Sequence, residues 1–164
     1  MHHHGYTWTG EKAAFDNEAL RRPPHPDPPP PPLPADPAAQ RLTERYREVV
    51  TAFTTTDLPP IQTAHWLLKP STLVRGTWTE PEEAVEWLRL QLAEPPHGLD
   101  TTTDPASWET ASVERLSWGA DISLGHYLAG TLFRSVAIVT CSPNRSSPEL
   151  RCPLPGLPRP GVRR

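Results

Sequence analysis

The chain has 164 residues, including 23 Pro and 9 Gly, and its 16 basic and 19 acidic side chains give a formal net charge of −3. This length allows one domain of ordinary size with tails and excludes two full domains. The charge gives no overall bias toward nucleic acid or membrane surfaces, and the longest strongly apolar run, residues 136–139, is far too short to cross a bilayer. With no secretory pattern at the start and only two cysteines, the sequence favours a cytoplasmic protein.

The apolar residues are concentrated in the middle of the chain. Of the 32 Leu, Ile, Val and Phe residues, 25 lie between positions 38 and 141. This distribution predicts a globular domain at 38–141 and, on either side of it, segments that cannot form a core alone. The flanking segments are an N-terminal aromatic and histidine-rich arm (1–22), a polyproline linker (23–37) and a tail rich in Pro and Arg (142–164).

The arm carries apolar residues of its own. Tyr6, Thr7 and Trp8 alternate like a short strand, and residues 11–22 are compatible with a weak helix. If the arm is ordered, it docks on the domain or on a partner, and Tyr6 and Trp8 are then the candidate partner-binding residues.

The linker contains ten prolines, which favour a stiff polyproline II spacer of roughly 45 Å.

The predicted elements of the domain alternate between helix and strand. Helices are expected at 37–53, 80–94 and 105–117, each with apolar residues at helical spacing. Residues 63–68 and 72–78 resemble short extended stretches, and residues 121–141 resemble a β-hairpin. The fold class expected is therefore α+β, with about three helices packed on a small antiparallel sheet that ends in a C-terminal hairpin.

The hairpin brings together a histidine and a serine. A two-residue turn at Gly130 and Thr131 pairs each residue i with residue 261 − i, which sets His126 opposite Ser135 on an apolar face. A three-residue loop with Gly130 in the left-handed region shifts this register. The pair is then either the catalytic pair of a hydrolase or a buried hydrogen bond, and the lack of a nucleophile-elbow turn favours the hydrogen bond.

Metal-ligating residues occur at both ends of the chain. Cys141 and Cys152 are separated by ten residues, and a mixed zinc site would recruit histidines from His2, His3 and His4, or His97 or His126. Two free thiols, or a disulfide formed on oxidation, are the simpler alternatives. Separately, His3 stands third from an amino terminus, an arrangement that can bind Cu(II) or Ni(II) in a square plane of nitrogens.

The tail has a net charge of +4, from Arg145, Arg151, Arg159, Arg163 and Arg164 against Glu149. Five arginines spread among prolines form a weak nucleic-acid footprint, so a solvated or self-associated tail is favoured.

Several blocks of sequence together resemble a group of short uncharacterised proteins from high-GC bacteria. These blocks are residues 1–6, 65–70, 81–88, 141–144 and 152–153. The resemblance implies no activity and no site residue. The residues themselves favour a non-enzymatic interaction module that binds a protein partner, with a small metal-binding protein as the alternative and a hydrolase as the weaker one.

Overall fold

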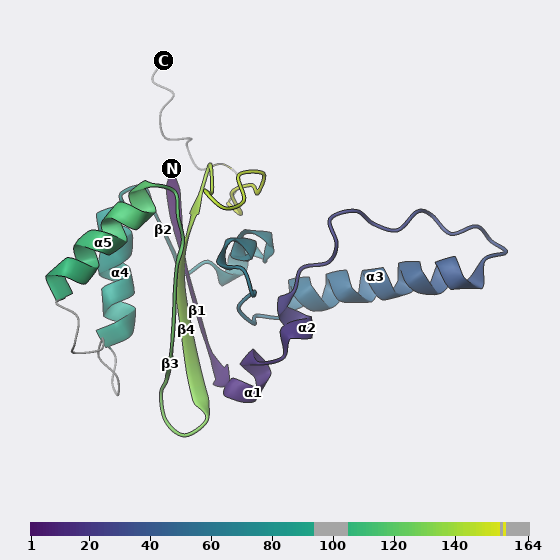
Figure 1. The fold of residues 1–164 in the computed structure, drawn as a ribbon, viewed down its shortest axis with the longest axis horizontal. Helices are drawn as coiled ribbons and strands as arrows, with labels where there is room; N and C mark the ends of the chain where they lie inside the picture. Colours follow the sequence, from purple (N-terminus) through teal and green to yellow (C-terminus); the bar gives the residue numbers. More distant parts are fainter. Residues whose placement is uncertain (94–104, 155, 157–164) are drawn as a thin grey trace, which may run out of the picture.

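The computed structural model describes residues 1–93, 105–154 and 156. Within this part of the chain it is an α+β fold built on a four-stranded antiparallel sheet, in agreement with the predicted fold class (Figure 1). The strand order is β2-β1-β4-β3, and the strands are β1 (His2–Glu11), β2 (Gly76–Trp78), β3 (Ile122–Tyr127) and β4 (Leu132–Cys141).

The first strand lies inside the sheet and not on a separate arm. β1 pairs with β4 along its whole length, from His2 opposite Cys141 to Glu11 opposite Leu132, and with β2 on its other side. The division into an arm at 1–22 and a domain at 38–141 is therefore wrong. Composition alone missed this strand because its buried residues are mostly His, Tyr and Trp, which do not count as aliphatic.

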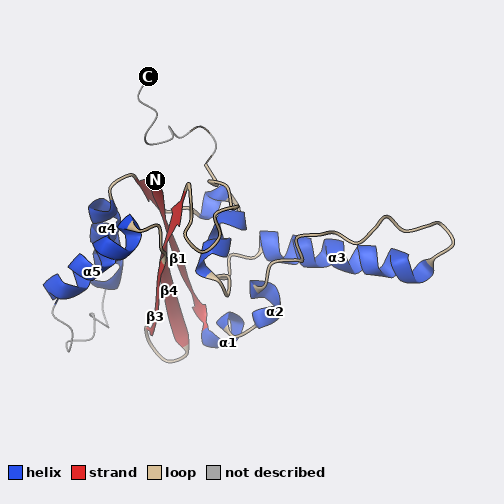
Figure 2. Cartoon of the chain, turned by 45° about the horizontal axis from the view of Figure 1, so that its top comes forward, coloured by secondary structure: helices blue, strands red, loops and turns tan. Residues whose placement is uncertain are grey.

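Helices and irregular segments cover both faces of the sheet (Figure 2). On one face, α4 (Pro81–Ala93) and α5 (Pro105–Ser117) bury Val85, Leu88 and Leu116 against Ile122 and Ile138 of the sheet. The other face is covered by the 3-10 helix η1 (Thr63–Leu68), the short helices α1 (Lys12–Phe15) and α2 (Glu18–Arg21), and the segment that follows β4. Because both faces of the sheet are covered, β1 is buried from His2 to Tyr6 and again at Trp8.

The remaining short elements differ in part from expectation. Residues 63–68 are 3-10 helix and not extended, and a second 3-10 turn, η2 (Ser71–Leu73), follows them before β2. The helices expected at 80–94 and 105–117 agree with α4 and α5 to within one residue. None of the helices in the described ranges combines the length and the apolar character that a bilayer crossing requires.

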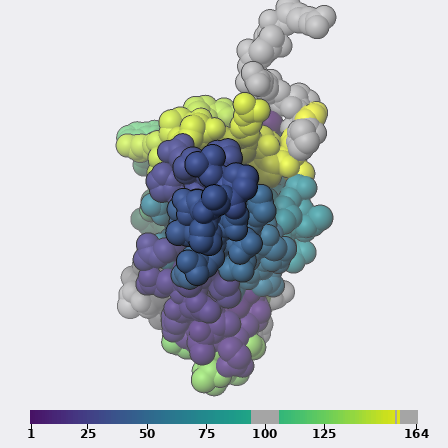
Figure 3. All heavy atoms as spheres, turned by 90° about the vertical axis from the view of Figure 1, so that its right-hand side faces the viewer, coloured from purple at the N-terminus to yellow at the C-terminus, as the bar shows by residue number. Residues whose placement is uncertain are grey.

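The helix α3 (Pro37–Thr55) forms as expected but does not pack on the sheet. Asp36 caps it by accepting hydrogen bonds from the backbone N–H groups of Ala38 and Ala39, both at 3.0 Å. Phe53 is its only buried residue, and Leu42 is 56% exposed. α3 projects from the body and the proline-rich segment runs back beside it, so that the pair faces the viewer in Figure 3. The prediction that this helix packs on the sheet is therefore wrong, and the face opposite α4 and α5 is covered by η1 and its neighbours.

A buried lysine joins the base of α3 to the body. The ammonium of Lys69 donates hydrogen bonds to the carbonyl oxygens of Phe53 at 2.5 Å and Thr56 at 3.0 Å. These carbonyls belong to the last turn of α3, where a cation is favoured by the helix dipole. Burial lowers the pKa of Lys69 to about 8, so the ammonium remains the main form at neutral pH.

The C-terminal hairpin forms in a register shifted by one residue. Ile122 pairs with Ile138 and His126 pairs with Arg134, so that each residue i faces residue 260 − i. Gly130 has φ +58°, in the left-handed region, so the connection is the three-residue loop that the sequence analysis gave as the alternative to a two-residue turn. His126 and Ser135 now belong to opposite faces of the sheet, because a one-residue shift reverses the facing of a strand. The expected His126–Ser135 contact is therefore absent, and with it the basis for a hydrolase.

Deleting residues 1–11 should abolish cooperative folding, because the deletion removes an interior strand and leaves one edge of β4 unpaired. Thermal denaturation followed by near-UV circular dichroism would measure this. As a control, replacing the five prolines at 28–32 by serines should move the midpoint by no more than a few degrees, since this segment runs beside the projecting helix α3 and away from the sheet (Figure 1). A truncated protein that melts at the wild-type midpoint would instead restore the idea of a separate arm.

Candidate metal centre

Four side chains from distant parts of the chain converge at one end of the sheet. They are His2, His4, Cys141 and Cys152, and one ligand atom from each lies within 4.8 Å of the other three. The first three are buried and Cys152 is half-buried. Both cysteines are free thiols. The four residues can therefore hold a metal ion.

The nitrogen–sulfur distances lie within about 0.4 Å of those in a tetrahedral metal site. His4 Nε2 lies 3.1 Å from Cys141 Sγ and 3.4 Å from Cys152 Sγ, while His2 Nδ1 lies 3.9 Å from each sulfur. With Zn–S near 2.3 Å and Zn–N near 2.0 Å, tetrahedral angles place these atoms about 3.5 Å apart, and a square-planar arrangement places neighbouring atoms about 3.1 Å apart. Three of the four distances exceed the square-planar value. The cluster is thus closer to the geometry that zinc prefers.

The sheet positions three of the four ligands. Side chains alternate along an extended strand, so His2 and His4 share one face of β1. The antiparallel register sets Cys141, at the end of β4, directly opposite His2. Neighbouring side chains on one face of a paired strand lie within reach of one another, which is what a shared ligand set requires.

The fourth ligand returns to the site on an irregular segment. After β4 the chain turns at Ser142, where φ is +66°, and passes through a cis peptide bond to Pro143. It then reaches Cys152, which packs with Leu150 beside the buried residues of the same sheet face. The sequence favoured a solvated or self-associated tail, and as far as Cys152 the second alternative holds, because Leu150 and Cys152 pack against the sheet. Arg159, Arg163 and Arg164 lie outside the described residues.

Asn144 holds this segment in place. Its amide nitrogen donates to Asp121 Oδ1 at 2.8 Å and to the carbonyl oxygen of Thr140 at 2.7 Å. Its side-chain oxygen accepts hydrogen bonds from the backbone N–H groups of Ser146 at 2.9 Å and Ser147 at 3.0 Å. The amide therefore joins the end of β4 to the loop that carries Cys152.

A hydrogen bond to Thr77 leaves one nitrogen of His4 available to a metal ion. His4 Nδ1 lies 2.9 Å from the hydroxyl oxygen of Thr77 on β2. When Nδ1–H donates to this hydroxyl, the lone pair is on Nε2, the atom that faces the two sulfurs. Burial, together with the neighbouring His2 and His3, lowers the pKa of His4 to about 4, so the ring is neutral at neutral pH as metal binding requires.

The thiols complete a ligand set whose charge matches a divalent cation. Burial raises the pKa of Cys141, so the thiol is protonated in the absence of a cation. A bound divalent ion deprotonates a coordinating thiol. Two thiolates with two neutral imidazoles then carry two negative charges, and the ion neutralises them, which makes the whole unit compatible with burial.

The third histidine is not part of the cluster. His3 faces the opposite side of β1, and its Nδ1 lies 3.0 Å from the hydroxyl oxygen of Thr140. That hydroxyl donates its own proton to the carbonyl of Ala120 at 2.8 Å, so His3 is the donor in the pair. Burial lowers the pKa of His3 to about 4. The expected Cu(II) or Ni(II) site is wrong for this fold, because residues 2 and 3 are paired in the sheet and His3 Nδ1 is engaged.

The other predicted site residues are elsewhere or have other roles. His126 lies on β3, opposite Arg134, and His97 lies outside the described residues. Tyr6 and Trp8 are buried, and Tyr6 stacks on Trp66 with ring centroids 4.6 Å apart. They are therefore core residues and not the partner anchors that a detached arm would have offered.

Comparisons of the chain with family models, with curated proteins and with solved structures returned no match. The chemistry of the His2, His4, Cys141 and Cys152 cluster is therefore the basis for assigning a function.

Replacing Asn144 by Ala should destabilise the protein by about 2–3 kcal/mol, since buried backbone groups lose their partners. Chemical denaturation would measure the change, and hydrogen exchange should accelerate at the amides of Ser146 and Ser147. The matched control is Ser146→Ala in the same loop, where the exposed hydroxyl is removed but the backbone bond to Asn144 is kept. Equal stability and equal exchange in the two variants would show that Asn144 does not hold the loop.

Proposed function

We propose that this chain is a zinc-binding protein whose ion is held by His2, His4, Cys141 and Cys152. The observation that carries the proposal is the set of nitrogen–sulfur distances, from 3.1 to 3.9 Å, among four side chains drawn from both ends of the sequence. Tetrahedral sites of two nitrogens and two sulfurs favour zinc over the metals that prefer square-planar or all-oxygen ligands.

The location of the ligands gives the ion a structural role. It links the start of β1, the end of β4 and the C-terminal segment, three parts of the chain that otherwise meet mainly through hydrogen bonds and apolar contacts. Four protein ligands leave no vacant position in a tetrahedral zinc site, which is the arrangement of structural zinc centres. Binding to the folded state alone also stabilises that state by mass action.

The purified wild-type chain should bind one Zn²⁺ per molecule and melt at a higher temperature with the metal than after chelation. Co²⁺ should replace Zn²⁺ and give the intense visible bands of a tetrahedral site with a sulfur-to-cobalt absorption in the near ultraviolet.

The binding free energy of a structural zinc ion is about 10–16 kcal/mol, and loss of one of four ligands removes roughly a quarter of it. Cys152→Ser and His4→Gln should therefore each weaken Zn²⁺ binding by about 100-fold or more.

Two histidine variants separate this site from nonspecific metal binding. His25→Gln removes an exposed imidazole on the proline-rich segment, and His3→Gln removes the imidazole on the other face of β1. Both should keep the Zn²⁺ affinity and the Co²⁺ spectrum, provided that circular dichroism shows the His3 variant folded. Wild-type protein that binds neither metal, or a Cys152→Ser variant that binds as tightly as wild type, would overturn the proposal.

We also propose a second function, binding of a protein partner, and we assign it to α3 and the proline-rich segment. Tyr46 OH donates to the carbonyl oxygen of His25 at 2.9 Å, which ties the two together. Between them lies an apolar groove of 340 Å³ whose walls include Pro29, Leu42 and Val49. An amphipathic helix whose apolar residues remain exposed away from the body is typical of protein interaction sites.

A double variant, Leu42→Glu with Val49→Glu, should abolish capture of the partner from extracts of the cells that produce the chain, while Zn²⁺ binding is unchanged. The control is Glu44→Gln with Glu48→Gln, which alters charges on the same helix and keeps the apolar residues. Species that the wild type and the control both capture, and the double variant does not, identify the partner. Equal capture by all three proteins would exclude this surface.

A further inference from the structure

The four ligands of the proposed zinc site are not held equally. His2, His4 and Cys141 lie on paired strands and are at most 3% exposed. Cys152 is half-buried and lies beyond the strands, on the segment anchored by Asn144 eight residues earlier. Among the described residues, no hydrogen bond between backbone groups outside the regular elements involves residues 151–154. Three ligands are thus fixed by the sheet, and the fourth is supplied by a loop.

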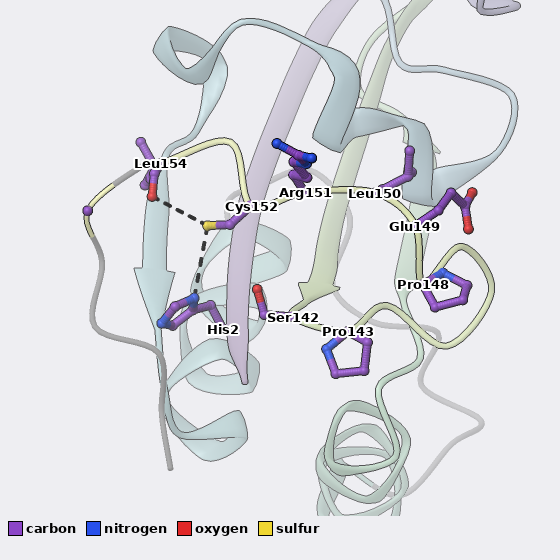
Figure 4. A pocket seen from close by; sticks show the side chains of 10 residues that line it. His2, Ser142, Pro143, Pro148, Glu149, Leu150, Arg151, Cys152 and Leu154 are labelled. Atoms are coloured by element: carbon purple, nitrogen blue, oxygen red, sulfur yellow. Dashed lines mark hydrogen bonds between the residues drawn. The ribbon is translucent and has the colours of Figure 1, made fainter. Parts of the chain in front are cut away.

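A pocket reaches the site on the side of the loop ligand. It has a volume of 760 Å³ and is lined by His2 and Cys152 but not by His4 or Cys141. Figure 4 shows the ring of His2 and the sulfur of Cys152 directed toward each other at this pocket, with the carbonyl of Leu154 on the far side of the sulfur. This volume lies within the range of small-molecule sites in proteins. A small molecule in the pocket would therefore meet His2 and Cys152, and of these two ligands only Cys152 lies outside the sheet.

We infer that the Cys152 position is an exchangeable coordination site, and that a small thiol entering through the pocket replaces Cys152 on the metal ion. The inference rests on the proposed zinc function and adds a ligand class to it. A thiol fits because the donor that it replaces is itself a thiolate, and a zinc site with two imidazoles and one thiolate retains its affinity for sulfur. Pro143, Leu150 and Leu154 offer apolar walls for the carbon part of the molecule.

The exchange is balanced without any oxidant or reductant. The bond between the metal and Cys152 Sγ breaks, and a bond forms between the metal and the sulfur of the incoming thiol. The proton of the incoming thiol passes to the released Cys152 thiolate, so the charge on the metal unit is the same before and after. The carbonyl of Leu154, 3.6 Å from Cys152 Sγ, is an acceptor for the resulting thiol proton.

The test uses Co²⁺-loaded Cys152→Ala and 2-mercaptoethanol as the thiol. The variant should bind Co²⁺ more weakly than wild type and show about half of the sulfur-to-cobalt absorption, because one thiolate of two is missing. Titration with 2-mercaptoethanol should restore the absorption in a saturable way, whereas ethylene glycol, which has a hydroxyl in place of the sulfur, should not. In wild type one thiolate replaces another, so the absorption should stay constant, and the exchange is followed instead by alkylation of the released Cys152 thiol. Half-saturation of the alkylation rate should need at least about 10-fold more 2-mercaptoethanol than the Cys152→Ala spectrum does, since the tethered Cys152 competes at high effective concentration.

Cys141→Ala is the matched variant. It also removes one thiolate, but from the side of the site that the pocket does not reach, so 2-mercaptoethanol should not restore its spectrum. If that variant does not fold, the contrast between 2-mercaptoethanol and ethylene glycol in Cys152→Ala still decides the matter. Wild type that binds Co²⁺ normally, with no response of Cys152→Ala to the thiol, would overturn the exchange alone. Wild type that binds no Co²⁺ would overturn the zinc function and the exchange together.

Discussion

The pairing of β1 with β4 in a single register is the constraint on which the rest of the structure depends. It sets His2 opposite Cys141 and directs His2 and His4 to the same face. A slip of one residue would turn both histidines toward α4 and α5 and bring His3 to the sulfurs in their place. The register is fixed because each face of the strand pair packs against its own set of side chains, so a slip would exchange the residues of the two faces and disrupt the packing of both.

The same strand carries two kinds of buried histidine, which differ in how their hydrogen-bonding needs are met. The Nδ1 of His3 donates to the hydroxyl of Thr140, which in turn donates to the carbonyl of Ala120. His4 is satisfied on one nitrogen by Thr77 and offers the other to the sulfurs. The face of the strand decides which of them can be a ligand, because the free Nε2 of His4 lies beside the two sulfurs, whereas His3 lies on the opposite face.

Sequence reasoning predicted the parts of this molecule that depend on local pattern. Apolar residues at helical spacing predicted α3, α4 and α5, and the β-rich runs predicted the hairpin. It also named both cysteines and the N-terminal histidines as candidate ligands. Had the strand been recognised, the alternation of its side chains would have placed His2 and His4 on one face and His3 on the other. The errors concern long-range packing. Three features depend on contacts between distant segments, which spacing along the chain does not encode. They are the interior position of β1, the lack of packing of α3 on the sheet, and the anchoring of the Cys152 loop by Asn144.

The sequence separation within the central strand pair has a consequence for how the molecule assembles. His3 and Thr140 are 137 positions apart in the sequence, so bringing them together costs a large loop-closure entropy. During synthesis on the ribosome, β1 is complete before more than 100 further residues, including those of its partner β4, have been added. Topologies dominated by such distant pairings fold slowly, and their strands remain unpaired in the meantime. The polar and histidine-rich composition of β1, which hid it from an aliphatic count, also keeps the waiting segment less prone to aggregation than a run of valines and isoleucines would be.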